Sequence, residues 1–189
     1  VHEGQASLYV CGPTVYSDSH LGHAKAYVSF DVILRYLRFC GLKTLYVQNI
    51  TDVGHLMGDA DEGEDKLLKR ARELNQEPMA VAESYSRRHF EAMDLLGVIR
   101  PDISPRATGH IPEQLEAIEK LLEHGLAYES NGSVYFEITK DPKYGELSNR
   151  KVEEMKSGAR VKVRSEKRHP GDFALWKRAE PEHLMRWRD

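Results

Sequence analysis

Two histidines three residues apart, His20 and His23, follow a short apolar segment and a turn. The apolar segment, Ala6–Val10, is typical of a strand, and Gly12-Pro13 cannot continue that strand. The residues of Ser17–Ser19 then offer short polar side chains of the kind that cap helices. A helix beginning there places both imidazoles in its first turn, where the helix dipole and unpaired N–H groups favour anions. The stretch therefore predicts a corner that stabilises negative charge developing on a phosphate.

The residues after His23 change to a helical period and then to a second apolar run. The helical apolar positions recur at spacings of three and four: Tyr27, Phe30, Ile33, Leu34, Leu37 and Cys40. On this pattern Cys40 is a small core residue, and Gly41 ends the helix. Leu42–Ile50 is typical of a second buried strand. Strand, helix and strand in this order predict a βαβ unit with a parallel sheet.

The carboxyl ends of the two predicted strands carry further polar groups. Ligands of parallel sheets bind beyond these ends, at Cys11-Gly12 for the first strand and at Asn49–Asp52 for the second. We expect the two ends to be neighbours and to line one crevice with His20 and His23. Cys11 has three interpretations: a buried core thiol, a nucleophile or a metal ligand. Composition favours the first, and no base is visibly paired with the thiol.

The remaining chain predicts helices and one hairpin. The helices span about 64–75, 78–96 and 111–124, and His89 on the second of them is expected to serve packing or to lie at the surface. Asn131-Gly132 separates the short strands 127–130 and 133–138, as in a type I′ hairpin. An antiparallel hairpin does not continue a parallel sheet, so we divide the chain into a half-domain at 1–107 and an insertion at 108–189.

Two charged segments stand out. Residues 52–65 carry six carboxylates, which a solvated loop and the acidic first turn of a helix explain better than a metal site, because the spacing is not that of an EF-hand. Residues 151–178 carry nine Lys or Arg against four acidic residues. An exposed strand edge explains such charge, and phosphate contact with an RNA end is the alternative.

Composition sets broad limits on the protein. The sequence has 189 residues, 40% hydrophobic and 30% charged, with a net charge of −3, which gives no global case for nucleic-acid binding. No apolar run approaches the ~20 residues of a membrane span, so no membrane contact is expected. Two cysteines make no disulfide framework, which favours a cytoplasmic protein. Because the chain begins at Val1, in polar sequence, we expect a piece of a longer protein.

His20-Leu21-Gly22-His23 after a strand resembles the H-[IL]-G-H motif of class I aminoacyl-tRNA synthetases. Cys11-Gly12-Pro13-Thr14-Val15-Tyr16, nine residues before it, resembles cysteinyl-tRNA synthetases specifically. The resemblance continues through 51–55, through 59–66 in one branch of the family, and through 100–108, 157–161 and 172–177. It implies an α/β fold with a Rossmann-like parallel-sheet half-domain that binds the nucleotide and an inserted α+β connective-peptide subdomain.

The resemblance also implies site residues and partners. It places adenylate contacts at five positions: Gly12, Thr14, His20, Gly22 and His23. It places His20 and His23 as catalytic, and it places the cysteine substrate against Cys11, Asn49 and Thr51. Cys11 is implied to bind one Zn²⁺ per subunit, which holds the substrate thiol as thiolate. ATP with Mg²⁺, L-cysteine and tRNA(Cys) are the implied partners of a monomer.

The chain departs from the family in what it lacks. The other zinc ligands and the Lys-Met-Ser-Lys-Ser loop of the family have no counterpart within residues 1–189, so we expect an intact protein that is an enzyme and a fragment that is inactive alone. Two alternatives to cysteine–tRNA ligation stay open. One is a paralogous ligase that joins activated cysteine to a small amine, and the other is a non-catalytic nucleotide- or RNA-binding module.

Overall fold

The computed structural model describes residues 3–53, 66–149, 166–179, 181, 183 and 185–187. These residues form two compact units, and the chain passes from the first unit to the second between His110 and Ile111. Each unit has its own helices and strands. Among the described residues, no helix is both long enough and apolar enough to cross a membrane.

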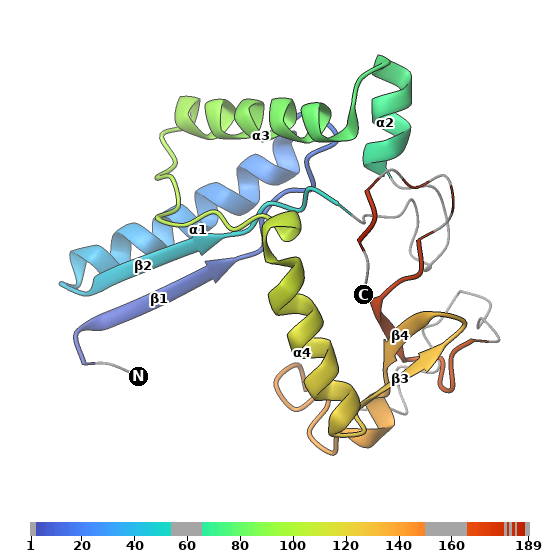
Figure 1. Ribbon diagram of the computed structural model, residues 1–189. Coiled ribbons are helices and arrows are strands. Elements are labelled where there is room, and N and C mark those ends of the chain that lie inside the picture. The colour runs from blue at the N-terminus through green and yellow to red at the C-terminus, as the bar shows by residue number, and fades with distance from the viewer. Residues whose placement is uncertain are drawn as a thin grey trace. The chain divides into compact units, whose positions relative to one another are not determined.

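A parallel strand pair organises the first unit (Figure 1). Strand β1 (Gln5–Val10) is followed by helix α1 (Leu21–Phe39) and strand β2 (Lys43–Gln48). The two strands pair in parallel, from Gln5 opposite Lys43 to Val10 opposite Gln48. The predicted βαβ unit is therefore confirmed, and the carboxyl ends of both strands lie at the same edge of the sheet.

A third extended segment lies along the other side of β2. The N–H of Gln48 donates to Ile103 O at 3.0 Å, and the N–H of Ile50 donates to Pro105 O at 2.8 Å. Parallel bridges join Val47 to Ile103 and Ile50 to Arg106. The sequence pattern did not predict this segment, because Pro101 and Pro105 remove backbone donors and argue against a strand. Strand β2 is consequently flanked on both sides.

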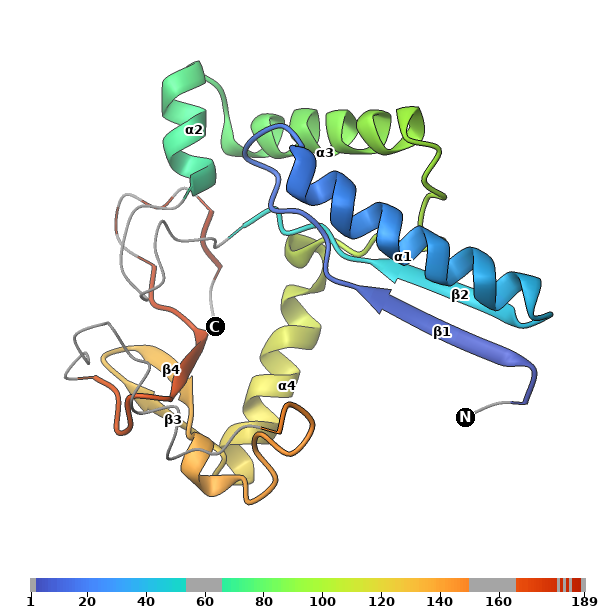
Figure 2. The ribbon, with the colours of Figure 1, turned by 180° about the vertical axis from the view of Figure 1, so that it is seen from behind.

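Helices α2 (Lys66–Leu74) and α3 (Pro78–Leu95) and the 3₁₀ helix η1 (Ala107–His110) complete the first unit. Pro78 stands at the first position of α3, where a missing N–H costs nothing. Both views show α1 running along the strands with α3 on the side of α1 away from them (Figure 2). The core unites residues of β1, α1, β2, α3 and the segment after α3: Val10, Tyr27, Leu34, Tyr46, Met93 and Val98.

Three details of α1 differ from the prediction. The helix is capped by His20 and not by the residues of Ser17–Ser19, because the imidazole itself accepts the N–H of Gly22. Ile33 is 46% exposed, so it does not belong to the buried stripe. Cys40 is exposed as well, since it forms the C-cap of the helix beside Gly41, whose φ is +82°. The expectation that Cys40 is a core residue is therefore wrong.

The second unit consists of helix α4 (Ile111–Glu123) and a small antiparallel sheet. Strands β3 (Ala127–Ser130), β4 (Ser133–Phe136) and β5 (Phe173–Trp176) are ordered β3-β4-β5, with the 3₁₀ turn η2 (Ile138–Lys140) after β4. Asn131 and Gly132 have φ of 51° and 74°, which confirms the predicted hairpin turn.

Asp172 holds the second unit together from inside. Its buried carboxylate accepts hydrogen bonds from Tyr128 Oη at 2.9 Å, from the N–H of Ile138 at 3.1 Å and from the N–H of His169 at 2.9 Å. Burial and the bond to this carboxylate raise the pKa of Tyr128 to about 12, although bonding by the backbone of Arg168 opposes the rise. Arg168 stacks over Tyr128 at 4.1 Å and pairs with Glu137 at 3.0 Å.

Candidate active site

His20 and His23 form a reciprocal cap at the start of α1. The N–H of Gly22 donates to Nδ1 of His20 at 3.0 Å, and the N–H of His20 donates to Nδ1 of His23 at 3.1 Å. The two rings lie 4.1 Å apart between centroids. This geometry is a capping box in which two imidazoles take the parts usually played by a hydroxyl and a carboxylate.

The cap decides where each imidazole carries its proton. A ring nitrogen that accepts a backbone N–H must have a free lone pair, so Nδ1 of both His20 and His23 is unprotonated. The neutral rings therefore carry hydrogen on Nε2. Burial lowers the pKa of His23, and the neighbouring His20 lowers it further, which favours the neutral form near pH 7. The pair supplies two neutral Nε2–H donors.

The carboxyl ends of β1 and β2 meet through Gly12 and Asn49. The N–H of Gly12 donates to Oδ1 of Asn49 at 2.8 Å, and Nδ2 of Asn49 donates to Oγ1 of Thr51 at 3.2 Å. A Cβ on Gly12 would lie 1.5 Å from the backbone oxygen of Asn49, so only glycine fits this approach. The Asn49 amide keeps one lone pair and one hydrogen for another partner.

Thr14 extends this junction of the strand ends. It forms a parallel bridge with Thr51, in which the N–H of Thr51 donates to Pro13 O at 3.0 Å and the N–H of Val15 donates to Thr51 O at 3.2 Å. The loop after β1 therefore continues alongside the loop after β2. The prediction that the two strand ends are neighbours is confirmed.

Cys11 lies at the same edge and is exposed, which does not fit the interpretation as a buried core thiol. Its backbone oxygen accepts the hydroxyl of Tyr27 at 3.3 Å. Tyr27 is buried on α1, where burial raises its pKa and the nearby Cys11 raises it further. The Tyr27 ring also stacks 6.3 Å from the ring of His23. Tyr27 thus joins the strand end to the histidine pair.

The predicted site residues fall into two groups of direct contacts. One group is the junction of the strand ends and holds Gly12, Thr14, Asn49 and Thr51. The other is the helix start and holds His20, Gly22 and His23. Cys11 adjoins the first group in sequence and reaches the second through Tyr27.

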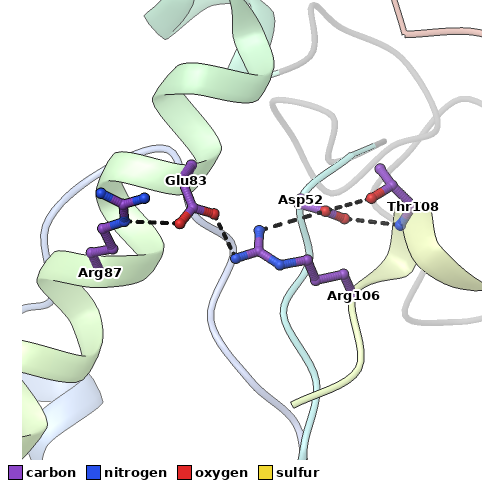
Figure 3. Close-up of polar contacts among 5 residues, drawn as sticks. All are labelled: Asp52, Glu83, Arg87, Arg106 and Thr108. Atoms are coloured by element: carbon purple, nitrogen blue, oxygen red, sulfur yellow. Dashed lines mark hydrogen bonds and ion pairs between the residues drawn. The ribbon is translucent and has the colours of Figure 1, made fainter.

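At Asp52 the interpretation of the acidic segment as a solvated loop is wrong. The Asp52 carboxylate has no exposed surface and accepts the N–H of Thr108 at 3.0 Å and the hydroxyl of Thr108 at 2.6 Å. Arg106 lies between this carboxylate, at 4.0 Å, and Glu83, at 2.8 Å (Figure 3). Glu83 in turn accepts from Arg87 at 2.8 Å, and Arg87 and Arg106 both lower its pKa.

Sequence reasoning missed this network because Asp52 is one of six carboxylates in residues 52–65, and composition does not distinguish it from the others. The position of Asp52 directly after a parallel strand was the available signal. The other acidic residues of that segment, Asp59 to Asp65, lie outside the described residues. So does most of the basic segment, 151–165.

A metal site needs several donors, and Cys11 alone supplies one of them. The described residues contain no group of three or more His, Cys, Asp and Glu that could hold a metal ion. Structural and catalytic zinc takes three or four protein ligands. The described residues alone therefore do not fit a zinc centre, although the exposed thiol of Cys11 suits one ligand position.

The family described as the class I (C) tRNA synthetase catalytic domain matches residues 1–189. The chain belongs to this family. The class I synthetase assignment agrees with the resemblance of Cys11–Tyr16 and His20–His23, the two stretches that meet through Tyr27.

Curated relatives bear the name cysteine–tRNA ligase. The protein of Chlorobaculum tepidum is 60% identical over 192 residues, which cover 99% of this chain and 39% of that protein. The protein of Deinococcus radiodurans is 61% identical over 184 residues, covering 97% of this chain and 37% of that protein. The chain thus spans less than two fifths of the length of these relatives.

Solved class I synthetases share the fold at low sequence identity. The LeuRS of Agrobacterium radiobacter K84, in a ternary complex with tRNA and LeuAMS, superposes with a TM-score of 0.52 at 19% identity. The match covers 72% of this chain and 17% of that one. It supports a class I synthetase-like fold of mixed helices and strands with a parallel sheet.

Proposed function

We propose that the protein containing this chain joins L-cysteine to tRNA(Cys) through a cysteinyl-adenylate. The observation that carries the proposal is the capped histidine pair, which supplies two Nε2–H donors beside the joined strand ends. Relatives about 60% identical, named cysteine–tRNA ligase, support this substrate over a small amine. The α-amino acid, ATP with Mg²⁺ and the tRNA are the partners that this activity requires.

The histidines suit the first half of the reaction. When the cysteine carboxylate attacks the α-phosphate of ATP, a new O–P bond forms, pyrophosphate leaves and negative charge grows on the phosphate oxygens. A carboxylate nucleophile has no proton to lose, so no general base is needed. His20 and His23 donate hydrogen bonds from Nε2 to the transition state as fixed dipoles, and such donors each contribute a factor of about 10²–10³ in rate.

The other predicted positions divide between the two substrates. We assign adenylate contacts to Gly12, Thr14 and Gly22 as well as to the histidines. Asn49 and Thr51 contact the cysteine, and the spare lone pair and hydrogen of the Asn49 amide support this role.

Cys11 is proposed as one ligand of a zinc ion whose other ligands come from the rest of the intact protein. Zinc bound there supplies an acceptor for the thiolate of cysteine, which the hydroxyl of serine matches poorly. The exposure of the Cys11 thiol at the edge of the sheet supports this assignment.

The second unit is proposed as the connective-peptide insertion of the half-domain, with the basic segment 151–178 contacting the tRNA acceptor end. Its antiparallel sheet supports a subdomain distinct from the parallel half-domain. We place the intact protein in the cytoplasm as a monomer, in keeping with the two cysteines of residues 1–189, which form no disulfide framework, and with the nature of the reaction.

The proposal is tested with the purified intact protein by exchange of labelled pyrophosphate into ATP and by charging of tRNA(Cys). We expect exchange that depends on cysteine and is far weaker with serine, followed by transfer to tRNA(Cys). His20→Ala and His23→Ala should abolish exchange. His124→Ala, at an exposed histidine of the second unit, is the matched control that leaves both rates unchanged.

Each other outcome would replace the proposal. Exchange without tRNA charging, but with ligation to a small amine, would establish the paralogous ligase. Binding of ATP or RNA with no exchange at all would establish a non-catalytic binding module.

A further inference from the structure

His89 is a buried polar side chain to which the proposed reaction gives no role. It lies on α3 and is only 2% exposed. Burial, with the charge of His23 as a smaller cause, lowers the pKa of His89 to about 4. The imidazole is therefore neutral near pH 7, with one nitrogen that donates and one that accepts.

The first nitrogen of His89 is bonded to the loop that leads into α1. Its Nδ1 lies 2.8 Å from Oγ of Ser19, the residue immediately before the helix cap His20. The neighbouring Arg88 pairs with Asp18 at 2.7 Å, but both of those side chains are about half exposed. Exposed ion pairs contribute little to the stability of a fold. The bond between His89 and Ser19 is part-buried, so it is the better shielded of these two polar connections between α3 and the loop before α1.

The second nitrogen of His89 lowers the stability of the fold. Nε2 is buried and has no hydrogen-bond partner among the described residues. An unsatisfied buried polar atom destabilises a fold, so a phenyl ring would serve packing better at this position. The imidazole is therefore better explained by the bond that its Nδ1 makes with Ser19 than by packing.

The imidazole ring of His89 also contacts Tyr27, the residue that bonds to the backbone of Cys11. Tyr27 lies edge-on to His89, with ring centroids 5.2 Å apart, and its hydroxyl donates to the backbone oxygen of Cys11. The ring of His23 lies 6.5 Å from that of His89, also edge-on. One side chain of α3 thus contacts the loop before His20, the ring of His23 and the tyrosine that bonds to the end of β1.

We propose that His89 is a positioning residue for adenylate formation: its Nδ1 holds Ser19, and through Ser19 the reciprocal cap of His20 and His23. The inference rests on the proposed function. His89 touches no substrate in this role. It fixes the backbone from which His20 begins, so that the Nε2–H donors keep the geometry that the transition state needs.

The test uses the intact protein and three variants of the pair. His89→Phe keeps a ring of similar size but removes both nitrogens, and Ser19→Ala removes the hydroxyl. His89→Asn places an amide where Nδ1 stood. We expect kcat for cysteine-dependent exchange to fall roughly tenfold in His89→Phe and in Ser19→Ala, with KM for cysteine unchanged. His89→Asn restores most of the rate.

Further comparisons separate positioning from stability. The double variant His89→Phe/Ser19→Ala should lose no more rate than either single variant, because both remove one bond. Val81→Ala, at a fully buried site of the same helix, is the matched control and should lower the thermal midpoint without changing kcat. Should His89→Phe fail to fold, Ser19→Ala alone carries the same expectation.

Hydrogen exchange of residues 17–24 provides a readout that does not need activity. These amides should exchange faster in His89→Phe and Ser19→Ala than in the wild type, His89→Asn or Val81→Ala. The inference would be overturned if both His89→Phe and Ser19→Ala kept the hydrogen-exchange rates and the kcat of the wild type. An inactive wild-type protein would overturn the proposed function instead, and the hydrogen-exchange comparison would still decide the role of His89.

Discussion

The glycine of the histidine motif, Gly22, is required by its contact with the ring of His20. A Cβ at this position would lie 2.8 Å from Cε1 and 3.0 Å from Nδ1 of His20. The ring of His20 folds back over Gly22 to accept its N–H, and that fold leaves no room for a side chain. The family resemblance implies an adenylate contact at Gly22, and the structure adds the imidazole of His20 as its nearest neighbour.

Replacing Gly22 by alanine should therefore damage the cap. We expect Gly22→Ala to turn the His20 ring off the N–H of residue 22, to cost about 1 kcal/mol of helix stability and to lower exchange about tenfold or more. Pyrophosphate exchange and thermal unfolding of the intact protein measure both effects. Gly109→Ala is the control, because its Cβ would meet nothing closer than 4.0 Å, and equal losses in the two variants would contradict the explanation.

The buried His89 gives the protein a predictable response to acid. Its pKa is about 4 in the folded state against an ordinary value of 6.5, so the unfolded state binds the proton more readily between these values. The stability contribution is complete above pH 6.5 and is lost as the pH falls towards 4. It should amount to about 2 kcal/mol between pH 7 and pH 5. His89→Phe should remove that part of the pH dependence.

Denaturant unfolding of the intact protein at pH 7 and pH 5, compared between wild type and His89→Phe, measures this contribution. The comparison of differences cancels the other histidines, whose titration both proteins share. An identical pH dependence in the two proteins would show that His89 titrates normally and is not buried as described.

At the scale of elements, β2 is the strand on which the first unit depends. It pairs with β1 on one side and with the segment 102–107 on the other. Asp52 follows it and fixes Thr108 at the end of that segment. The carboxylate therefore ties the end of the segment 102–107 to the loop after β2, which carries the candidate cysteine contacts Asn49 and Thr51.

Asp52→Asn should loosen this connection. One carboxylate oxygen becomes an amide donor that faces the donors of Thr108, and Arg106 loses a buried counter-charge. We expect hydrogen exchange of residues 102–110 to accelerate roughly thirtyfold, which corresponds to about 2 kcal/mol of local stability.

Glu83→Gln is the matched control for Asp52→Asn. Glu83 touches the same Arg106, but its side chain is 44% exposed, so its charge contributes at most about 1 kcal/mol. Exchange that is equally fast in both variants would mean that burial of Asp52 has no special importance.

The sequence predicted those parts of the fold that depend on local pattern. The apolar periods gave both strands and the long helices, and Asn131-Gly132 gave the hairpin, because these signals reside in neighbouring residues. The segment 102–107 escaped because its pairing with β2 depends on distant residues, while its prolines argue locally for a break.

The candidate site was predictable to the same degree. The topology of a βαβ unit predicted that Gly12 and Asn49 lie close together, and the structure confirms this. The cap by His20, the contact of His89 with Ser19 and the burial of Asp52 were not predictable, because each depends on side chains 2 to 70 residues apart meeting in three dimensions.

At the scale of the whole molecule, Cys11 should be necessary for zinc but not sufficient. We expect the intact protein to bind one Zn²⁺ and Cys11→Ser to lose it, because the thiolate is one of about four ligands. Residues 1–189 alone should bind zinc weakly and should not catalyse exchange. Metal analysis after dialysis checks both statements, with Cys40→Ser as the control at the other exposed thiol of the chain. Full zinc content in Cys11→Ser would exclude this ligand.

The central claim is that His20 acts through its Nε2–H and not only as a helix cap. His20→Asn separates these roles, since asparagine is a favoured N-cap that still accepts the N–H of Gly22 but has no group at the place of Nε2. The decisive measurement is cysteine-dependent pyrophosphate exchange by the intact His20→Asn protein. A loss of about 10²–10³ in kcat with unchanged helix stability is the predicted result. Wild-type kcat in this variant would contradict the account.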